Sequence, residues 1–414
     1  MPLSRQFGST IYKINMGIEK HHFIPEDMRG EITLRVNRIQ EIMKRSGVEA
    51  LLLTGNANVF YTSGRFFRGY TYIPLSGEAI YFIMRPDIYD TSSVRSYTIR
   101  KPEQIPSVME ENAIALPATV GYEYDDLSFS EVKRLQAVFP DATAADGGAV
   151  MREARMRKTP YEIGQMEADG LHQAAVYRRI PRVFKEDMTD VEFQIEIEHI
   201  LRMEGCLGRA RMSGRLMEIN MGSVLYGENA DAPTPYEFAL GGAGTDPSLP
   251  VGADGSIMHS GHTVMVDMNG AFNGYQTDMT RVWRIGDIPE KAVKAHDCSR
   301  KILRRLEEIG KPGCPVADLY NEAMRIVEEE KLERYFMGHT QRVAFIGHGV
   351  GIELNEQPPI TGRSKVLLAE GMTLAIEPKF VIPGVGAVGV ENTYVVTDCG
   401  LRCLTPFEEE IQEL

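Results

Sequence analysis

The segment Val264–Thr280 constrains the fold of this chain more than any other. Its sequence, VMVDMNGAFNGYQTDMT, begins with an apolar run and contains the turn dipeptides Asn269-Gly270 and Asn273-Gly274. This pattern predicts two strands joined by a tight turn. Asp267 lies on the first strand and Asp278 on the second, so we expect the hairpin to bring their carboxylates face to face. Two ionised carboxylates in a partly buried site repel each other unless a proton or a cation lies between them.

Three further side chains that commonly bind metals lie downstream, each beside glycine or proline. They are His348 in GHGVG, Glu377 in AIEP and Glu391 in GVEN. Taken singly, an aspartate is typical of a solvated turn, Glu391 of a charged strand face, and a lone histidine of a structural role. Glu377 follows an apolar run, so in a buried position it must pair with or bind something. Together the four carboxylates and one imidazole indicate a site for two divalent metal ions.

Composition limits the class of protein. The net charge of −13 argues against a nucleic-acid partner. No apolar run is long enough for a transmembrane helix, and the N-terminus lacks the apolar core of a signal peptide, so we expect no membrane partner. The 5 cysteines are odd in number and scattered, so we expect no disulfide framework and a reducing, cytoplasmic location.

The 414 residues are enough for two domains. We expect an N-terminal extension over residues 1–30, whose role the sequence does not identify, and a first α/β domain over residues 31–150. Apolar spacing in that domain predicts helices and strands. The predicted helices cover residues 31–47 and Val132–Val138, and the predicted strands are Ala50–Leu53, Val59–Tyr61, Tyr70–Ile73 and Ala79–Met84.

We expect a second domain over residues 155–414. It opens with a helix after Thr159 that has proline in its first turn, and Thr189 with Glu192 predicts a capping box for the next helix. The stretch 206–262, rich in glycine and proline, is expected to form a pocket wall. Helices are predicted over Pro289–Ile309 and Val316–Glu330, with short strands across 343–405.

Four motifs of the second domain resemble, in order and spacing, those of the pita-bread metallopeptidase family. The motifs are VDMNGAFNGYQTDMTR, GHGVGIELNEQPPI, LAIEPKF and GVENTYVVT. That family includes methionine aminopeptidase, Xaa-Pro aminopeptidase, prolidase and creatinase. Residues 31–150, with LLLTGNANVFYTSG, resemble the N-terminal domain of the Xaa-Pro aminopeptidase branch. The resemblance implies a mixed α/β (α+β) protein with a pita-bread catalytic domain and a smaller creatinase-like domain.

The resemblance also implies roles for the candidate residues. Asp278 and Glu391 would bridge two divalent ions, with Mn²⁺ foremost and Co²⁺, Zn²⁺ or Fe²⁺ as alternatives. Glu377 would be the catalytic residue that carries a proton from the attacking water to the leaving amine. A homodimer is the usual assembly of this branch. The complete set of implied metal ligands is Asp267, Asp278, His348, Glu377 and Glu391.

Three positions depart from the pattern of the peptidases. Val251 and Asn355 stand where these enzymes have histidines that hold the substrate, and Gly389 stands where the prolyl-specific members have an arginine. Because the substrate contacts are altered, we consider Asn355, His339 and Tyr275 as candidate substrate-binding residues.

Three functions are compatible with these features. The leading hypothesis is a dinuclear metal-dependent hydrolase that removes N-terminal residues from peptides, either an Xaa-Pro aminopeptidase or a dipeptidase. An alternative is a metalloenzyme on the same fold that acts on a non-peptide substrate, as a small-amide hydrolase or a lyase. A third is a binding module without catalysis, although a binding role alone gives no reason to retain four clustered carboxylates.

Overall fold

The computed structural model describes residues 22–214 and 217–414, which divide into two compact units. The described part of the first unit comprises residues 22–123 and 128–147, and the second unit comprises the remaining described residues. Residues 1–21 of the expected N-terminal extension lie outside the described residues. Phe23 and Met28 belong to the remaining part of that expected extension and are buried in the first unit. This part of the segment therefore packs into the core of the unit. The expected domain limits stay predictions.

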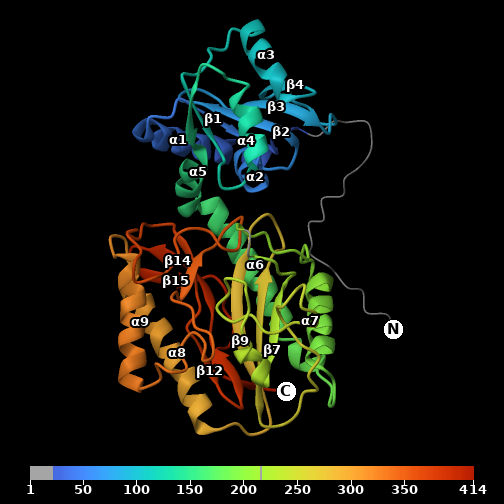
Figure 1. Cartoon of the computed structure of the whole chain (residues 1–414), viewed down its shortest axis with the longest axis vertical. Coiled ribbons are helices and arrows are strands. Elements are labelled where there is room, and N and C mark those ends of the chain that lie inside the picture. Colours follow the sequence, from blue (N-terminus) through green and yellow to red (C-terminus); the bar gives the residue numbers. More distant parts are fainter. Residues whose placement is uncertain (1–21, 215–216) are drawn as a thin grey trace. The chain divides into compact units, whose positions relative to one another are not determined.

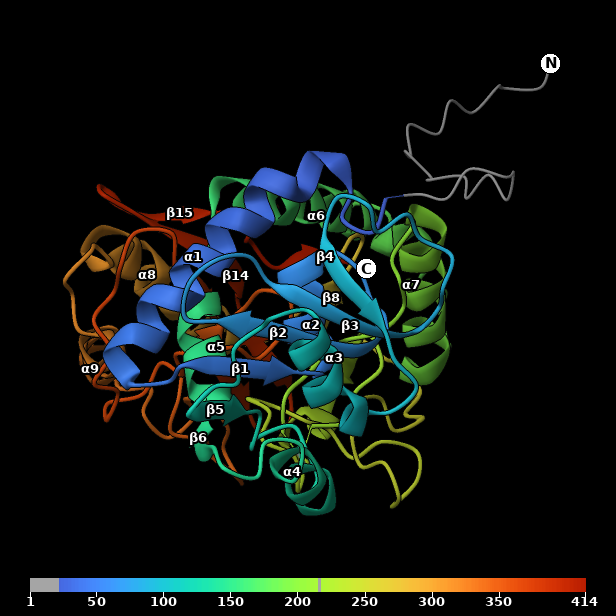
Figure 2. The ribbon, with the colours of Figure 1, turned by 90° about the horizontal axis from the view of Figure 1, so that it is seen from above.

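The first unit is built on a six-stranded mixed sheet with the strand order β4-β3-β2-β1-β5-β6, which Figures 1 and 2 show from two directions. The pairs β1–β2 and β2–β3 are antiparallel, and β1–β5, β5–β6 and β3–β4 are parallel. Its strands are β1 (Ala50–Leu53), β2 (Arg68–Pro74), β3 (Ile80–Arg85), β4 (Arg95–Thr98), β5 (Thr119–Tyr122) and β6 (Thr143–Asp146). Its helices are η1 (Glu26–Met28), α1 (Arg29–Ser46), α2 (Asn56–Ser63), η2 (Pro102–Gln104), α3 (Ile105–Glu111) and α4 (Phe129–Gln136).

One predicted strand of the first unit is wrong. Val59–Tyr61 lies within helix α2, which is preceded by Gly55 and closed by Gly64 in the left-handed conformation. Three consecutive apolar residues carry no period, so they fit a strand or a buried helical turn equally well. The helix is favoured here because the two glycines define its start and end and its inner face is buried.

In the second unit, strands lie between two pairs of helices (Figure 1). Helices α6 and α7 pack on the sheet β16-β9-β8-β7, and α8, which pairs with α9, packs on β12, β13 and β15. The helices are α5 (Gly147–Met156), which starts in the first unit, α6 (Pro160–Tyr177), η3 (Ile180–Arg182), α7 (Asp190–Glu204), η4 (Gly227–Asp231), α8 (Glu290–Ile309) and α9 (Val316–Glu330). Among the described residues, no helix is long and apolar enough to span a bilayer.

The second unit contains three sets of paired strands. The sheet under α6 and α7 is joined by a second sheet, β10-β11-β14-β15, and by the hairpin β12-β13. The strands are β7 (Gly222–Tyr226), β8 (His262–Gly270), β9 (Thr277–Ile285), β10 (Gly347–Gly349), β11 (Thr373–Ile376), β12 (Lys379–Ile382), β13 (Gly386–Gly389), β14 (Asn392–Thr397), β15 (Gly400–Cys403) and β16 (Gln412–Glu413).

The predicted helix starts of the second unit are confirmed. Thr159 accepts a hydrogen bond from the backbone of Glu162, whose side chain returns to the backbone of Thr159, and Thr189 forms the same capping box with Glu192. Each box provides partners for backbone N–H groups that the first turn of a helix leaves unpaired. The capped helices α6 and α7 are thereby fixed against the sheet that carries Asp267 and Asp278.

Helix α6 approaches the segment after β15 so closely that only glycine fits at the contact. A Cβ atom on Gly170 would lie 1.9 Å from the carbonyl oxygen of Leu404, whereas one on Gly164 of the same helix would have no heavy atom within 4 Å. The two glycines therefore separate the effect of helix propensity from the effect of packing.

We predict opposite effects when these glycines become alanine. Gly170→Ala should destabilise the protein by about 1–3 kcal/mol, because the methyl group forces the backbone of Leu404 away. Gly164→Ala should stabilise it by about 0.5–1 kcal/mol, because alanine loses less conformational entropy in a helix. Urea unfolding of both variants measures the difference, and equal shifts would contradict the proposed contact.

Candidate metal centre

The hairpin of β8 and β9 places the first two candidate ligands. Asp267 pairs with Thr280 and Asp278 pairs with Asn269, so the aspartates are diagonal neighbours on one face of the sheet and not directly opposite each other. Diagonal neighbours lie roughly 7–8 Å apart at the backbone, within reach of side chains. The residues between Gly270 and Thr277 form the turn. The predicted hairpin is confirmed, except that the two aspartates are diagonal neighbours and not directly opposite each other.

The other three candidate ligands lie on or directly beside three neighbouring strands. His348 is the middle residue of β10 and pairs with Ala375 of β11. Glu377 directly follows β11 and Glu391 directly precedes β14, and the pairing of β11 with β14 brings these two positions together. Gly349 is required beside the histidine, because its Cβ would lie 2.0 Å from the carbonyl oxygen of Gln357.

The structure therefore brings all five predicted ligands together. Their side chains form two overlapping groups, and in each group the potential ligand atoms lie within 4.8 Å of one another. Oxygen and imidazole donors of this kind suit divalent ions such as Mn²⁺, Co²⁺, Fe²⁺ and Zn²⁺. One group contains Asp278, His348 and Glu391, and the other contains Asp267, Glu377 and Glu391.

Hydrogen bonds orient the ligand atoms of the first group. The Nδ1 of His348 lies 3.0 Å from the carbonyl oxygen of Gly349, to which it donates, so Nε2 keeps its lone pair. That Nε2 lies 3.8 Å from Asp278 Oδ2 and 3.8 Å from an oxygen of Glu377. Glu391 Oε2 accepts a hydrogen bond of 2.7 Å from Thr280. Its Oε1 is buried and has no hydrogen-bond partner among the described residues.

A residue that the sequence reasoning missed, Lys379, completes the cluster. It is the first residue of β12 and is 1% exposed. Its Nζ donates to Asp267 Oδ2 at 2.7 Å and to Glu377 Oε2 at 2.6 Å, and lies 3.1 Å from Glu391 Oε2. A lysine at the start of the apolar run KFVI was the available signal, because a charge buried in such a strand requires an anionic partner.

Burial and mutual repulsion dominate the electrostatics of the cluster. Burial, and then the charge of Asp267, raise the pKa of the Asp278 carboxyl well above its ordinary value. Burial and then Asp278 do the same to the pKa of Glu391. Burial by itself would lower the pKa of the Lys379 ammonium, but the adjacent carboxylates outweigh it and hold that pKa well above its ordinary value. The cluster therefore favours bound cations.

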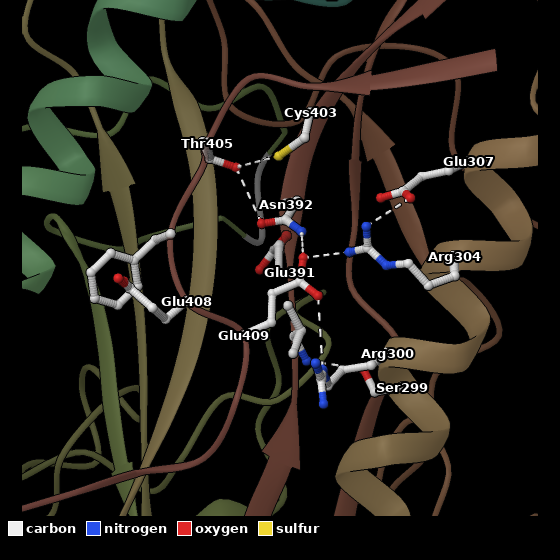
Figure 3. A network of polar contacts seen from close by, with 12 residues as sticks. Ser299, Arg300, Arg304, Glu307, Glu391, Asn392, Cys403, Thr405, Glu408 and Glu409 are labelled. Atoms are coloured by element: carbon white, nitrogen blue, oxygen red, sulfur yellow. Dashed lines mark hydrogen bonds and ion pairs between the residues drawn. The ribbon is translucent and has the colours of Figure 1, made fainter. Parts of the chain in front are cut away.

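A polar network behind the cluster fixes the backbone on both sides of Glu391 (Figure 3). The backbone N–H of the preceding residue donates to Ser299 Oγ at 2.9 Å. The side chain of Asn392, the following residue, donates to Glu409 Oε1 at 2.9 Å, and Arg304 donates to that same oxygen at 2.5 Å. Helix α8 and the C-terminal segment thus hold Glu391 in place through its two neighbours.

The cluster opens into a cavity of about 620 Å³. Asp267, Asp278, His348 and Glu377 lie in its wall, and most of the remaining wall is apolar. The stretch 206–262, which the sequence analysis expected to form a pocket wall, supplies a large part of it. The apolar lining comprises Met212, Met217, Ile219, Pro235, Phe238, Ala239, Leu240, Val343, Ala344, Phe345, Leu354 and Pro359.

Two of the three positions that depart from the peptidase pattern serve the local backbone. Asn355 lines the cavity, but its amide accepts from and donates to the backbone of Ser213, at 2.8 and 2.6 Å. Gly389 has a φ of +144°, and a Cβ there would lie 2.7 Å from the carbonyl oxygen of Pro378, so this backbone accepts no side chain. Val251 is half-buried in a loop and is not part of the cavity wall.

Two candidate substrate-binding residues do not reach the cavity, which corrects the expectation. His339 lies 3.2 Å from a carboxylate oxygen of Asp231 and stacks on Tyr335. Tyr275 is buried and donates to Glu162 at 3.1 Å. Neither lines the cavity, because the side chain of each is turned toward another carboxylate.

Comparison with known proteins identifies the family. The model of metallopeptidase family M24 matches residues 165–398. The chain belongs to this family. The model of the creatinase/prolidase N-terminal domain matches residues 35–157, which covers most of the first unit. The expected membership of the pita-bread M24 family, with a creatinase-like domain before the catalytic domain, is thus confirmed.

Relatives and solved structures of M24 proteins match almost the whole chain. The chain is 25% identical to the Xaa-Pro dipeptidase of Pyrococcus horikoshii, over 91% of this chain and 98% of that protein. It is likewise 25% identical to the Xaa-Pro dipeptidase of Pyrococcus furiosus, over 91% of this chain and 99% of that one. The solved structure of an Xaa-Pro dipeptidase from Bacillus anthracis has a TM-score of 0.75 at 20% identity and covers 92% of this chain and 100% of its own.

Family membership settles the class of protein. The chain is an M24 enzyme with the fold that the resemblance implied, and the expectation of a metal-dependent peptidase is confirmed at that level. The M24 family implies divalent metal ions. The individual ligands and the catalytic role of Glu377 stay predictions.

We predict that Asp278→Asn lowers the affinity for divalent metal by about 10–100-fold or more, because the change keeps the size of the side chain and removes its charge. His348→Ala should have a similar effect. Asp231→Asn, which changes an acid outside the cluster, is the control. Metal analysis of the desalted proteins measures the effect, and unchanged metal content in Asp278→Asn would contradict this assignment.

We predict a pH-dependent stability from Asp169, which accepts a hydrogen bond from the backbone of Phe272 in the β8–β9 turn. Burial raises its pKa to about 8. The folded protein therefore keeps a proton that the unfolded chain releases near pH 4, and stability falls as the pH rises from about 4 to 8. Asp169→Asn removes this effect, so urea unfolding should show the variant gaining about 1–3 kcal/mol on the wild type from pH 5 to pH 8. A difference that is constant with pH would refute the prediction.

Proposed function

We propose that this chain is an Xaa-Pro peptidase, which hydrolyses the peptide bond before proline in dipeptides or at the N-terminus of longer peptides. The observation that carries this proposal is the position of the ligand cluster in the wall of a largely apolar cavity. The relatives matched over nine-tenths of the chain support it, because they are named Xaa-Pro dipeptidases.

The side chains present fit a divalent ion. The buried Oε1 of Glu391 has no hydrogen-bond partner among the described residues, and Nε2 of His348 is turned toward Asp278 and Glu377. We propose that Mn²⁺ is the ion, with Co²⁺, Zn²⁺ or Fe²⁺ as alternatives for the same donors. When bound, such an ion polarises the scissile carbonyl and lowers the pKa of the attacking water.

In this proposal Glu377 moves the proton. Its Oε2 is held by Lys379 at 2.6 Å, and its Oε1 lies 3.8 Å from Nε2 of His348, on the side of the candidate ligands. Glu377 takes a proton from water as the oxygen attacks the carbonyl carbon, and gives that proton to the amine nitrogen as the C–N bond breaks. Because Lys379 fixes one carboxylate oxygen, the other is left for this transfer.

The cavity suits a small peptide with an apolar ring. A volume of about 620 Å³ lies within the range of ordinary small-ligand sites. Phe238, Phe345 and Met212 provide an apolar wall for a proline ring, whose burial is favourable in proportion to its area. The candidate ligands lie in the same wall, and in this proposal the reacting peptide bond lies beside them.

The alternative of a non-peptide substrate is not favoured by these relatives. It was motivated by Asn355, Gly389 and Val251, which replace substrate-binding residues of the peptidases. Asn355 and Gly389 serve the local backbone instead. We attribute the departures to a different way of holding a peptide in the cavity.

The assembly and location are also part of this proposal. We expect a homodimer, the usual assembly of the branch that the sequence resembles, and a reducing, cytoplasmic compartment, for which the odd number of scattered cysteines is the argument. The net charge of −13 gives no basis for a nucleic-acid partner. Light scattering of the purified protein measures the assembly directly.

We predict that the Mn²⁺-loaded enzyme releases the N-terminal residue from Xaa-Pro dipeptides or Xaa-Pro-Yaa tripeptides and leaves non-prolyl peptides intact. Mass spectrometry of the products shows which length is preferred, and hence whether the enzyme is a dipeptidase or an aminopeptidase. Glu377→Gln should lower kcat by roughly 10²–10⁴-fold because the proton carrier is lost.

The matched control is Glu370→Gln, which changes an exposed glutamate outside the cavity. It should leave kcat unchanged. Hydrolysis that persists in Glu377→Gln would disprove the role of Glu377, and failure to cleave any Xaa-Pro peptide would disprove the proposed substrate class.

A further inference from the structure

Lys379 lies where a second metal ion would lie. Its Nζ is 2.7 Å from Asp267 Oδ2, 2.6 Å from Glu377 Oε2 and 3.1 Å from Glu391 Oε2. A lysine ammonium has three N–H donors and no acceptor; here it donates to Asp267 and Glu377 and forms an ion pair with Glu391. The ammonium thus contacts carboxylates from three different places in the chain, within β8, directly after β11 and directly before β14.

These three carboxylates are one of the two groups that could hold an ion. A ligand oxygen from each of Asp267, Glu377 and Glu391 lies within 4.8 Å of the others. A divalent ion on those oxygens would lie about 2.0–2.2 Å from each, inside the volume that the ammonium fills. The lysine and an ion therefore exclude each other from this group.

The other group has its ligand atoms available. Nε2 of His348 and Oδ2 of Asp278 are 3.8 Å apart, which is too long for a hydrogen bond. Oε1 of Glu391 is buried without a hydrogen-bond partner among the described residues. These three atoms are donors for one ion, and Oε1 of Glu377 lies beside them, 3.8 Å from the imidazole.

The surrounding structure keeps the lysine in place. Lys379 pairs with Gly389 across the β12–β13 hairpin, and a Cβ atom on Gly389 would lie 2.9 Å from Cα and 3.4 Å from Cγ of the lysine. The aliphatic part of the Lys379 side chain therefore packs against the backbone of Gly389, which carries no side chain. Because the residue is only 1% exposed, its side chain would have to leave this packed position before an ion could bind to the three oxygens.

From this geometry we infer that the Lys379 ammonium permanently replaces one of two metal ions, so the chain binds a single divalent ion on Asp278, His348 and Glu391. The inference rests on the metal site of the proposed function and specifies its stoichiometry. The lysine supplies positive charge to the three carboxylates that the missing ion would otherwise have neutralised. It is a positioning residue, since it holds Asp267, Glu377 and Glu391 without touching the reacting bond.

The test is the number of ions that the full-length protein binds. Chelator-treated protein is titrated with Mn²⁺ by calorimetry, and bound metal is counted by elemental analysis after gel filtration. The wild type should bind one equivalent per chain. Lys379→Met, which removes the charge and keeps most of the stem, should bind two. Electron paramagnetic resonance should show an isolated Mn²⁺ in the wild type and an exchange-coupled pair in Lys379→Met.

Lys158→Met is the matched control, because Lys158 is also buried and paired with a glutamate, at 2.8 Å from Glu356, outside the cluster. It should still bind one equivalent. A wild type that binds two equivalents, or none, overturns the inference, as does a folded Lys379→Met that binds only one. If Lys379→Met does not fold, the wild-type count alone decides.

Peptide turnover plays no part in this test, so the inference and the proposed function fail separately. One bound ion without cleavage of Xaa-Pro peptides would uphold the inference and refute the proposed substrate. Two bound ions together with normal cleavage would refute the inference and uphold the proposed substrate.

Discussion

The repulsion among four carboxylates is the constraint on which the catalytic unit depends. Asp267 and Asp278 come from one hairpin, and Glu377 and Glu391 come from beside β11 and β14, much later in the sequence, so the two pairs meet only in the folded unit. Bringing like charges together in a buried site is unfavourable unless cations or hydrogen-bond donors compensate. Lys379 and Thr280 provide such donors. The strand pairings, the capped helices and the polar network around Glu409 together keep the four carboxylates close to one another.

Much of this arrangement could be predicted from the sequence, because its determinants are local. The hairpin follows from two turn dipeptides between apolar runs. The start of α6 follows from proline in its first turn, and the start of α7 follows from the spacing of Thr189 and Glu192. The five candidate ligands were found because each lies in a short motif with glycine or proline neighbours. Where a feature depended on a three-residue apolar run, as at Val59–Tyr61, the period was too short to distinguish a strand from a helix.

The features that sequence reasoning missed depend on contacts between distant segments. Lys379 resembles an ordinary charged residue on a short strand, and its burial becomes evident only when β12 pairs with β13 beside the carboxylates. His339 and Tyr275 were considered because they lie near ligand motifs, but each has a carboxylate partner elsewhere in the unit, Asp231 and Glu162 respectively. Proximity in sequence gave no information on which way these side chains turn.

The contact between Lys379 and Gly389 has a consequence for how such a site can evolve. A Cβ atom at position 389 would lie 2.7 Å from the carbonyl oxygen of Pro378 and 2.9 Å from Cα of residue 379, whatever side chain residue 379 carries. Only the 3.4 Å contact with Cγ depends on the lysine. A relative that carries a side chain at position 389 must therefore space this hairpin differently. The step between the two forms is a change of backbone, and the choice of side chain at position 379 does not by itself decide it.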